Sequence, residues 1–300
     1  MTQIQAVSHL VEMAEHLQRM KDVSFYNTTL MTLKKMYHHK YWNSSTNSYQ
    51  GNTQTSNLMP LVLNIPPPTE RVMAANAFVA NVIKAGNASE SGLVGASFVL
   101  QALVVAGRGD IALSMAMREA EPSWGFMLKK GPGTIWETWN DQTNSHNHPM
   151  FTASIGPYLY SIVGLNPSTW KIPLYLKYLN ENDVSKKNVV TNMVTMHLTP
   201  DVHAVSVLKS ASGYVDTLCG EVQIAWKSDV ERFDMNVSIP HNCGRARLEL
   251  HVPTKLRMEK NVQLCVGDIV VGGLSEKGKT VNVFVSGGKS VVALTRCKLL

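Results

Sequence analysis

The first part of the chain repeats apolar residues at the spacing of an amphipathic helix. In the opening twenty residues, Ile4, Val7, Leu10 and Leu17 lie three, three and seven positions apart, which places them on one helix face. Glu12 interrupts the stretch with a charge, as a secretory signal peptide would not. We therefore expect this segment to be a surface helix of a folded domain.

The same periodicity predicts further helices up to about residue 165. The segments between them are short and rich in Gly and Asn, so neighbouring helices should form antiparallel hairpins. Asp110 is expected to be an N-cap, and Pro157 is expected to bend the last helix. The predicted helices are Tyr26 to Tyr37, Thr53 to Leu63, "PPPTER" to about Ile83, Leu93 to Ala106, Asp110 to Ala120, and about Met150 to Val163.

After "GLNPSTW" the pattern changes from helical spacing to alternation. Apolar and polar residues alternate over short spans that end at Gly, Pro or Asn, which is typical of antiparallel strands with one solvated face. The clearest spans are "VDTLCGEVQIAWKS", "ERFDMNVSIP", "ARLELHVP" and "TVNVFVSGG". They predict a β-sandwich of about eight strands. The fold class is therefore α+β and multidomain, with a helical domain over 1–168 and a sandwich domain over 169–300.

Composition narrows the class of protein. Hydrophobic residues make up 44% and charged residues 17%, as in a globular protein, and no apolar run is long enough to span a bilayer. The net charge of +6 comes mostly from single basic residues after Trp170, without the aromatic residues of a nucleic-acid groove. We expect neither a nucleic acid nor a membrane as partner.

The four cysteines, with no CxxC pair, favour buried free thiols over disulfides.

The stretch "GTIWETWNDQTNSHNHPMF" holds the densest chemistry in the chain. Glu137 lies between Trp136 and Trp139, and His146 and His148 follow. Flanking indoles would limit the access of water to the carboxylate, and an imidazole could hold it by a hydrogen bond, so Glu137 could act as a base. A Glu that makes a capping bond in a turn has the same local sequence. The residues alone leave both interpretations open.

The two histidines could also bind a metal, because an H-x-H pair on a strand points both rings to one side. They lack a third histidine, or a carboxylate at ligand spacing, so we expect no metal and no cofactor. A hydrogen bond from His148 to a sugar hydroxyl is the favoured interpretation, with His146 orienting it.

The tryptophans and one glutamine complete the candidate site. Trp124, Trp136 and Trp139 are close in sequence and adjoin the glycines of "KKGPG", which suits an exposed platform for the apolar face of a sugar. The platform is the favoured interpretation for Trp136 and Trp139, and a core position is an equal alternative for Trp124. Gln54 could contact a ligand or cap its own helix turn.

Five motifs occur in an order that resembles a known family. They are "GNTQTSNLMPLVL", "SGLVGASFVLQALVVAGRGDIAL", "EPSWGFML", "TIWETW" and "SHNHPMF". Together they resemble successive landmarks of the α-L-rhamnosidases of glycoside hydrolase family 78. "GYVDTLCGEVQIAWK" and "FDMNVSIPHN" resemble the sandwich that closes those enzymes. The resemblance runs from about residue 25 to the end of the sequence.

The resemblance implies the second part of an (α/α)6 six-hairpin toroid, followed by a C-terminal β-sandwich. It also implies that Glu137 is the general base of an inverting hydrolase that removes terminal α-L-rhamnose. His148 would contact the sugar, the tryptophans would wall the pocket, and Gln54 would line the barrel mouth. The substrate would be a rhamnose-containing glycoside.

The family's acidic stretch, which supplies the general acid, has no counterpart here. Before Asp110 the chain has only scattered carboxylates (Glu12, Glu15, Asp22, Glu70 and Glu90). We therefore expect a fragment that depends on a missing N-terminal half or another subunit. The alternatives are a non-catalytic rhamnose-binding or assembly module and a different six-hairpin glycosidase or lyase.

Overall fold

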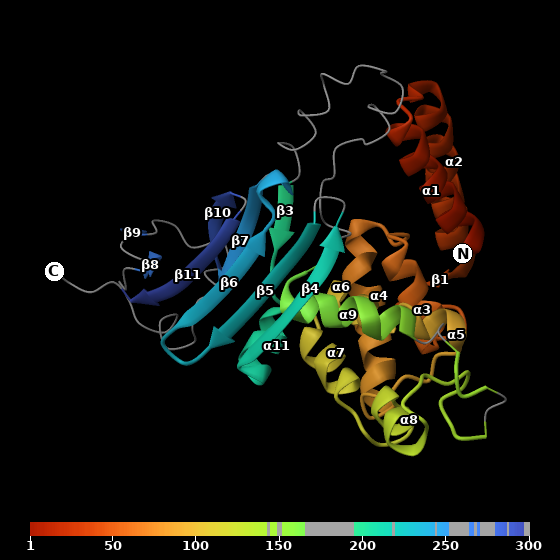
Figure 1. Cartoon of the computed structure of the whole chain (residues 1–300). Helices are drawn as coiled ribbons and strands as arrows, with labels where there is room; N and C mark the ends of the chain where they lie inside the picture. Colours follow the sequence, from red (N-terminus) through yellow and green to blue (C-terminus); the bar gives the residue numbers. More distant parts are fainter. Residues whose placement is uncertain are drawn as a thin grey trace. The chain divides into compact units, whose positions relative to one another are not determined.

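The computed structural model divides the chain into two compact units, Met1–Tyr158 and Leu159–Leu300 (Figure 1). The residues that it describes are 1–142, 145–148, 152–165, 195–217, 220–243, 245–251, 264–266, 269–270, 280–286 and 288–296. The predicted domain boundary, between residues 168 and 169, lies outside these ranges and stays a prediction.

The first unit is helical, as predicted. Two short strands, β1 (Trp42–Asn43) and β2 (Ser48–Tyr49), form a hairpin after its second helix. Its helices are α1 (Thr2–His16), α2 (Met20–Tyr41), α3 (Gln54–Val62), α4 (Pro68–Lys84), α5 (Leu93–Ala96), α6 (Val99–Val105), α7 (Gly109–Ala116), α8 (Trp124–Lys130) and the first half of α9 (Thr152–Val163).

Helices α1 and α2 form a hairpin with a small core of their own. Ile4 and Val11 of α1 are buried against Leu30 of α2 and Ile65, which follows α3. The hairpin confirms the predicted first helix. Helix α2 is longer than the predicted span of Tyr26 to Tyr37, because residues on both sides of that span continue the helix.

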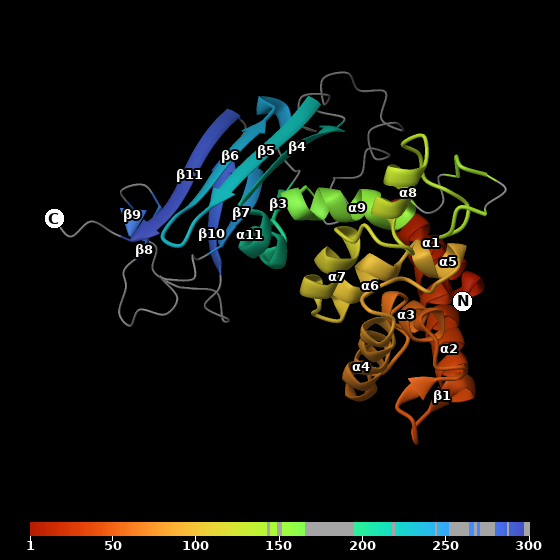
Figure 2. The same cartoon turned by 90° about the horizontal axis from the view of Figure 1, so that it is seen from below.

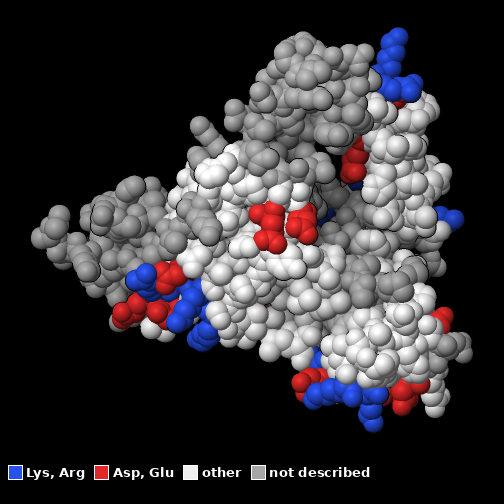
Figure 3. Space-filling view, viewed as in Figure 1, with Lys and Arg blue, Asp and Glu red and all other residues white. Residues whose placement is uncertain are grey.

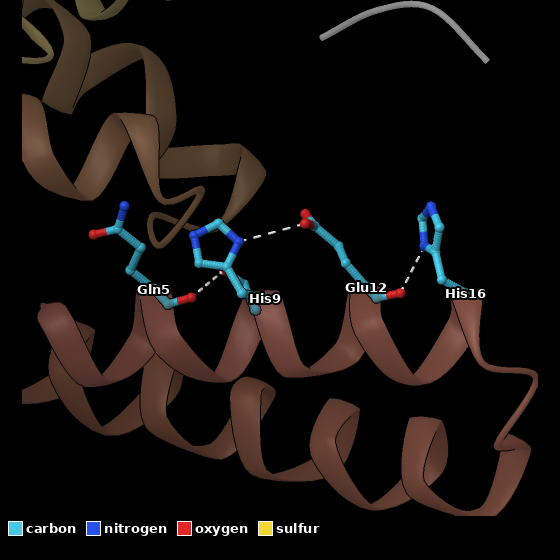
Figure 4. A network of polar contacts seen from close by, with 5 residues as sticks. Gln5, His9, Glu12 and His16 are labelled. Carbon is cyan, nitrogen blue, oxygen red and sulfur yellow. Dashed lines mark hydrogen bonds and ion pairs between the residues drawn. The ribbon is translucent and has the colours of Figure 1, made fainter. Parts of the chain in front are cut away.

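The outer side of α1 carries polar contacts that contribute little to stability. Figure 4 shows His9 Nδ1, 3.4 Å from Glu12 Oε2, and His16 Nδ1, 2.8 Å from the carbonyl oxygen of Glu12. The His9 and Glu12 side chains are about two-thirds exposed, and ion pairs in such positions are worth little. In the described part of the chain no three His, Cys, Asp or Glu side chains form a group that could hold a metal.

Helix α3 begins with a side-chain cap, and α4 begins at the predicted prolines without one. The Thr53 side chain accepts a hydrogen bond from Ser56 N, and the Ser56 hydroxyl oxygen accepts one from Thr53 N, which completes a capping box. Pro68 is the first residue of α4, where a missing N–H costs nothing, and Glu70 lies in the first turn.

Two predictions about α5, α6 and α7 were wrong. The span from Leu93 to Ala106 is two helices, and at the break the Ser97 hydroxyl donates to Leu93 O, 2.9 Å away. Asp110 makes no N-cap. Its carboxylate instead accepts two hydrogen bonds from the Arg108 guanidinium, so α7 begins at Gly109 and has no side-chain cap.

Helix α8 was not predicted. It has seven residues, which is too short to show helical periodicity, and its signal is local: Ser123 Oγ accepts a hydrogen bond from Phe126 N. This helix places Trp124 at its first position, and therefore bears on the candidate site.

The second unit contains two sheets, in agreement with the expected β-sandwich. Within the described residues the strand orders are β4-β5-β6-β11-β8-β9 and β10-β7-β3, and Figure 2 shows them as two layers. The strands are β3 (Thr195–Leu198), β4 (Ser210–Thr217), β5 (Gly220–Ser228), β6 (Phe233–Ile239), β7 (Arg245–His251), β8 (Leu264–Val266), β9 (Ile269–Val270), β10 (Thr280–Ser286) and β11 (Gly288–Arg296), with helix α11 (Val202–Leu208) between β3 and β4.

Alternation along the strands fixes which face is buried. In β6, Phe233, Met235, Val237 and Ile239 are buried, and the residues between them are more exposed. In β7 the buried positions are again every second residue, Ala246, Leu248 and Leu250. All described pairs are antiparallel except that of β3 with β7, which is parallel, so the expectation of a purely antiparallel sandwich was wrong for β3.

The expectation of free thiols was wrong for Cys243. Its side chain is fully buried and disulfide-bonded. On the face shown in Figure 3, acidic and basic side chains of the described residues lie near one another at several places. Among the described residues, Arg232 forms an ion pair with Asp234. None of the described helices is both long enough and apolar enough to cross a membrane.

A partly buried network of hydrogen bonds links α2, β2 and α4. His38 Nε2 lies 2.5 Å from Glu70 Oε2, and His38 Nδ1 lies 2.9 Å from the Tyr49 hydroxyl. Burial, reinforced by Tyr37 and Glu70, raises the pKa of Tyr49, so its hydroxyl stays protonated. The neutral hydroxyl can then donate to Nδ1 while Nε2–H donates to the Glu70 carboxylate. The Trp42 ring stacks on the imidazole at 5.5 Å.

Tyr49→Phe should therefore lower the free energy of unfolding of the first unit by about 1–2 kcal/mol, because it leaves the buried Nδ1 without a donor. Urea denaturation followed by tryptophan fluorescence measures the change. The matched variant is Tyr26→Phe, which keeps a ring packed on the core between α1 and α2 and should change stability by less than about 0.5 kcal/mol. Equal midpoints of unfolding for the two variants would contradict the stabilising role assigned to the hydrogen bond between Tyr49 and His38.

Candidate active site

Backbone hydrogen bonds fold the segment that carries Glu137 back on itself. Glu137 N donates to Ser145 O at 3.0 Å, and His148 N donates to Ile135 O at 2.7 Å. The Thr134 hydroxyl also donates to the carbonyl oxygen of His146. The segment's described residues, 133–142 and 145–148, form a loop and not the strand considered for the two histidines. It nevertheless brings Glu137 and the histidines together, as the sequence suggested.

The tryptophans differ in exposure. Trp136 is only 1% exposed, and its ring packs edge-on against His146, with centroids 4.8 Å apart, and against Phe126. Trp124, 3% exposed, packs edge-on against Trp139 at 5.1 Å. The expectation of an exposed platform was therefore wrong for Trp136, and the alternative of a core residue holds for Trp124. Trp139 is half-buried and is the remaining candidate for stacking on a sugar.

The glycine before this segment allows the close packing of Trp136. A Cβ at Gly131 would lie 2.6 Å from Trp136 Nε1. The "KKGPG" glycine therefore accommodates a buried indole, which is a different use from the exposed platform that the sequence suggested.

Trp139 ties the loop to a second segment of irregular backbone. Its Nε1–H donates to Ser91 O at 2.8 Å. That second segment is itself held by Gln54, whose Nε2 donates to Ala88 O at 3.0 Å and whose Oε1 accepts from Glu90 N at 2.9 Å. Gln54 is buried and does not cap its own helix, because Thr53 does so. A direct contact between Gln54 and a sugar stays a prediction.

Three buried polar atoms in these two segments lack partners within the described residues. They are Ser91 Oγ, Trp136 Nε1 and His148 Nδ1. Buried polar groups nearly always have a partner, so each of these atoms could take a hydrogen bond from or to water or a polar ligand. The imidazole hydrogen bond to Glu137 that the sequence suggested is not made through Nδ1 of His148.

The loop carries one half-buried carboxylate, Glu137, and also bears two imidazoles and two indoles. A carboxylate in such a place can take a proton from water, and the imidazole can exchange hydrogen bonds with a hydroxyl. The sequence did not predict that Ala88 and Glu90 bond to Gln54, because these contacts use backbone atoms and no side-chain motif marks them. The buried polar Gln54 at a helix start was the available signal.

Comparison with family models assigns both parts of the chain. Residues 2–163, more than half of the chain, match the bacterial alpha-L-rhamnosidase 6 hairpin glycosidase domain, and residues 195–264 match the bacterial alpha-L-rhamnosidase C-terminal domain. The chain belongs to the bacterial alpha-L-rhamnosidase family. This confirms the resemblance and the fold class, a partial six-hairpin helical domain followed by a β region.

Relatives of this rhamnosidase-family chain are much longer than it is. An alpha-L-rhamnosidase of Alteromonas sp. (strain LOR) is 25% identical over 224 residues, which are 74% of the chain and 23% of the relative. A rhamnosidase structure from Dictyoglumus thermophilum matches with a TM-score of 0.77 and 21% identity, over 98% of the chain and 31% of that structure. A Streptomyces avermitilis alpha-L-rhamnosidase complexed with L-rhamnose matches with a TM-score of 0.75 and 19% identity, over 97% and 26%.

The approach of α5 to α3, which places Ser91, allows no side chain at Gly95. A Cβ there would lie 2.4 Å from Thr55 Oγ1 and 2.7 Å from Ser91 Cβ. Gly95→Ala should therefore destabilise the first unit by about 1–3 kcal/mol. The control is Gly156→Ala in α9, where no atom lies within 4 Å of the new Cβ. Thermal unfolding distinguishes them, and a Gly95→Ala protein as stable as the control would contradict the tight packing.

Proposed function

We propose that this chain is the part of an α-L-rhamnosidase that carries the general base, Glu137, for hydrolysis of terminal α-L-rhamnose with inversion. The observation that carries the proposal is the folded loop that contains the half-buried Glu137 and two buried polar atoms without partners among the described residues, Trp136 Nε1 and His148 Nδ1, in a chain of the rhamnosidase family. The Streptomyces avermitilis relative complexed with L-rhamnose supports a rhamnose-type ligand.

Inversion requires two carboxyl groups on opposite faces of the sugar, roughly 6.5 to 9.5 Å apart, so that a water molecule fits between the base and the anomeric carbon. Glu137 would accept the proton of that water as it attacks. The His148 imidazole would exchange a hydrogen bond with a sugar hydroxyl, and His146, packed on Trp136, would help to hold the loop. The half-buried Trp139 ring would contact the apolar face of the deoxy sugar.

The general acid would come from outside this chain. Of the five carboxylates before Asp110, Glu12, Asp22 and Glu70 lie within 4 Å of a basic side chain. The other two are exposed. The chain spans about a quarter of the length of the curated relatives, which leaves room in a rhamnosidase for an acid on another segment or subunit.

The chain alone should therefore be nearly silent on an aryl α-L-rhamnoside. Any residual activity should fall by about 10²–10⁴ in Glu137→Gln, because an amide cannot accept the proton of water. The control is Glu119→Gln, an exposed carboxylate paired with Lys129, which should leave the rate unchanged. Release of the aglycone measures the rate, and NMR of the first sugar product identifies its anomer. Activity that survives Glu137→Gln, or a product of retained configuration, would refute the mechanism.

A second candidate is a non-catalytic rhamnose-binding or assembly module. It is favoured by the exposed apolar side chains of α1 and α2, among them Met13, Phe25 and Met31, which are each more than half exposed. Surfaces of this kind often mark protein interfaces. A module should bind L-rhamnose in calorimetry without hydrolysing rhamnosides and should self-associate or bind a partner in size-exclusion chromatography with light scattering. A monodisperse monomer that does not bind rhamnose would exclude it.

A further inference from the structure

A continuous set of hydrogen bonds connects helix α3 with the loop that carries Glu137. Gln54, the first residue of α3, holds Ala88 and Glu90 by its side-chain amide. The next residue, Ser91, accepts the indole N–H of Trp139, two positions after Glu137. We propose that Gln54 is a positioning residue for Glu137, acting through residues 88–91 and Trp139; the catalytic meaning of this role rests on the proposed function.

The need for Gln54 follows from the burial of the segment that it holds. Ala88, Ser89 and Ser91 are at most 2% exposed, yet residues 88–92 belong to no helix or strand. Backbone groups in such a place need partners. By bonding the carbonyl of Ala88 and the N–H of Glu90, the Gln54 amide pairs with the segment as a neighbouring strand would, and so fixes the direction of the Ser91 carbonyl.

The other end of the connection is equally constrained. The Trp139 ring packs edge-on against the buried Trp124 ring, which limits the positions from which its N–H can donate. Ser91 is further held by its contact with Gly95. Displacement of the Ser91 carbonyl would therefore move Trp139 or break its hydrogen bond, and would free the loop that contains Glu137.

The structure provides reporters for this role. The amides of Glu137 and His148 are hydrogen-bonded across the loop, so their hydrogen-exchange protection measures how well the loop is held. It also provides a matched control, Asn57. This residue is a fully buried amide on the same helix, but it bonds Tyr49, Asn52 and Asn81 instead.

The experiment measures hydrogen exchange of backbone amides by NMR in the whole 300-residue chain and its variants. Gln54→Met should lower the protection of the Glu137 and His148 amides by about tenfold relative to amides in α4, because both hydrogen bonds of the Gln54 amide are lost. Asn57→Leu should destabilise the unit but leave the ratio between loop and α4 unchanged. If both variants lower the ratio equally, or neither does, Gln54 has only a structural role and the proposal fails.

A second variant keeps the test open if Gln54→Met does not fold. Trp139→Phe removes the indole donor and keeps a smaller aromatic ring beside Trp124, and it should free the same two amides. Where Gln54→Met folds, the protection in the double variant should fall no further than in the stronger single variant, because both substitutions interrupt one connection. Additive losses would overturn the proposal. The exchange experiment needs no sugar, so its outcome is independent of the Glu137→Gln assay, which alone decides the proposed function.

Discussion

The candidate site depends on backbone pairing within one loop. The hydrogen bonds from Glu137 N and His148 N give an irregular segment a defined shape without a helix or strand. A catalytic base must be held near its substrate within a fraction of an ångström, and a loop achieves this only when neighbouring structure supports it. Here the support comes from the buried amide of Gln54 and the indole of Trp139, which both form hydrogen bonds with residues 88–91. The position of Glu137 thus depends on hydrogen bonds of Gln54 and Trp139 that are made within the protein and without a sugar.

Much of the fold could be predicted from sequence, because periodicity and caps act locally. The apolar face of α1, the capping box at Thr53 and the alternation in β6 each signal their element within a few residues. The break between α5 and α6 and the short helix α8 escaped prediction, because single side-chain hydrogen bonds decide them. The disulfide of Cys243 escaped because pairing depends on the folded chain and not on local spacing.

The sequence brought the residues of the candidate site to attention, and their roles stay predictions; their packing was not predicted. The order of motifs brought Glu137, Trp139 and His148 to attention, and the fold places them in one loop. The burial of Trp136 depends on Phe126 and His146, and the role of Gln54 depends on residues 34 and 36 positions away. Such contacts leave no periodic trace in a sequence. They explain why the expected platform of tryptophans is mostly core, with Trp139 alone partly open.

The surface of the helical hairpin has a chemical consequence of its own. Met13, Met20, Met31 and Met36 of α1 and α2 are each more than half exposed. Accessible thioethers oxidise to sulfoxides, which replaces a soft apolar group with a polar one. A protein stock exposed to peroxide would thus carry a more hydrophilic hairpin than a fresh one, and methionine sulfoxide reductase would restore it. The extent of methionine oxidation in a sample will therefore affect how strongly the surface of α1 and α2 binds other apolar surfaces.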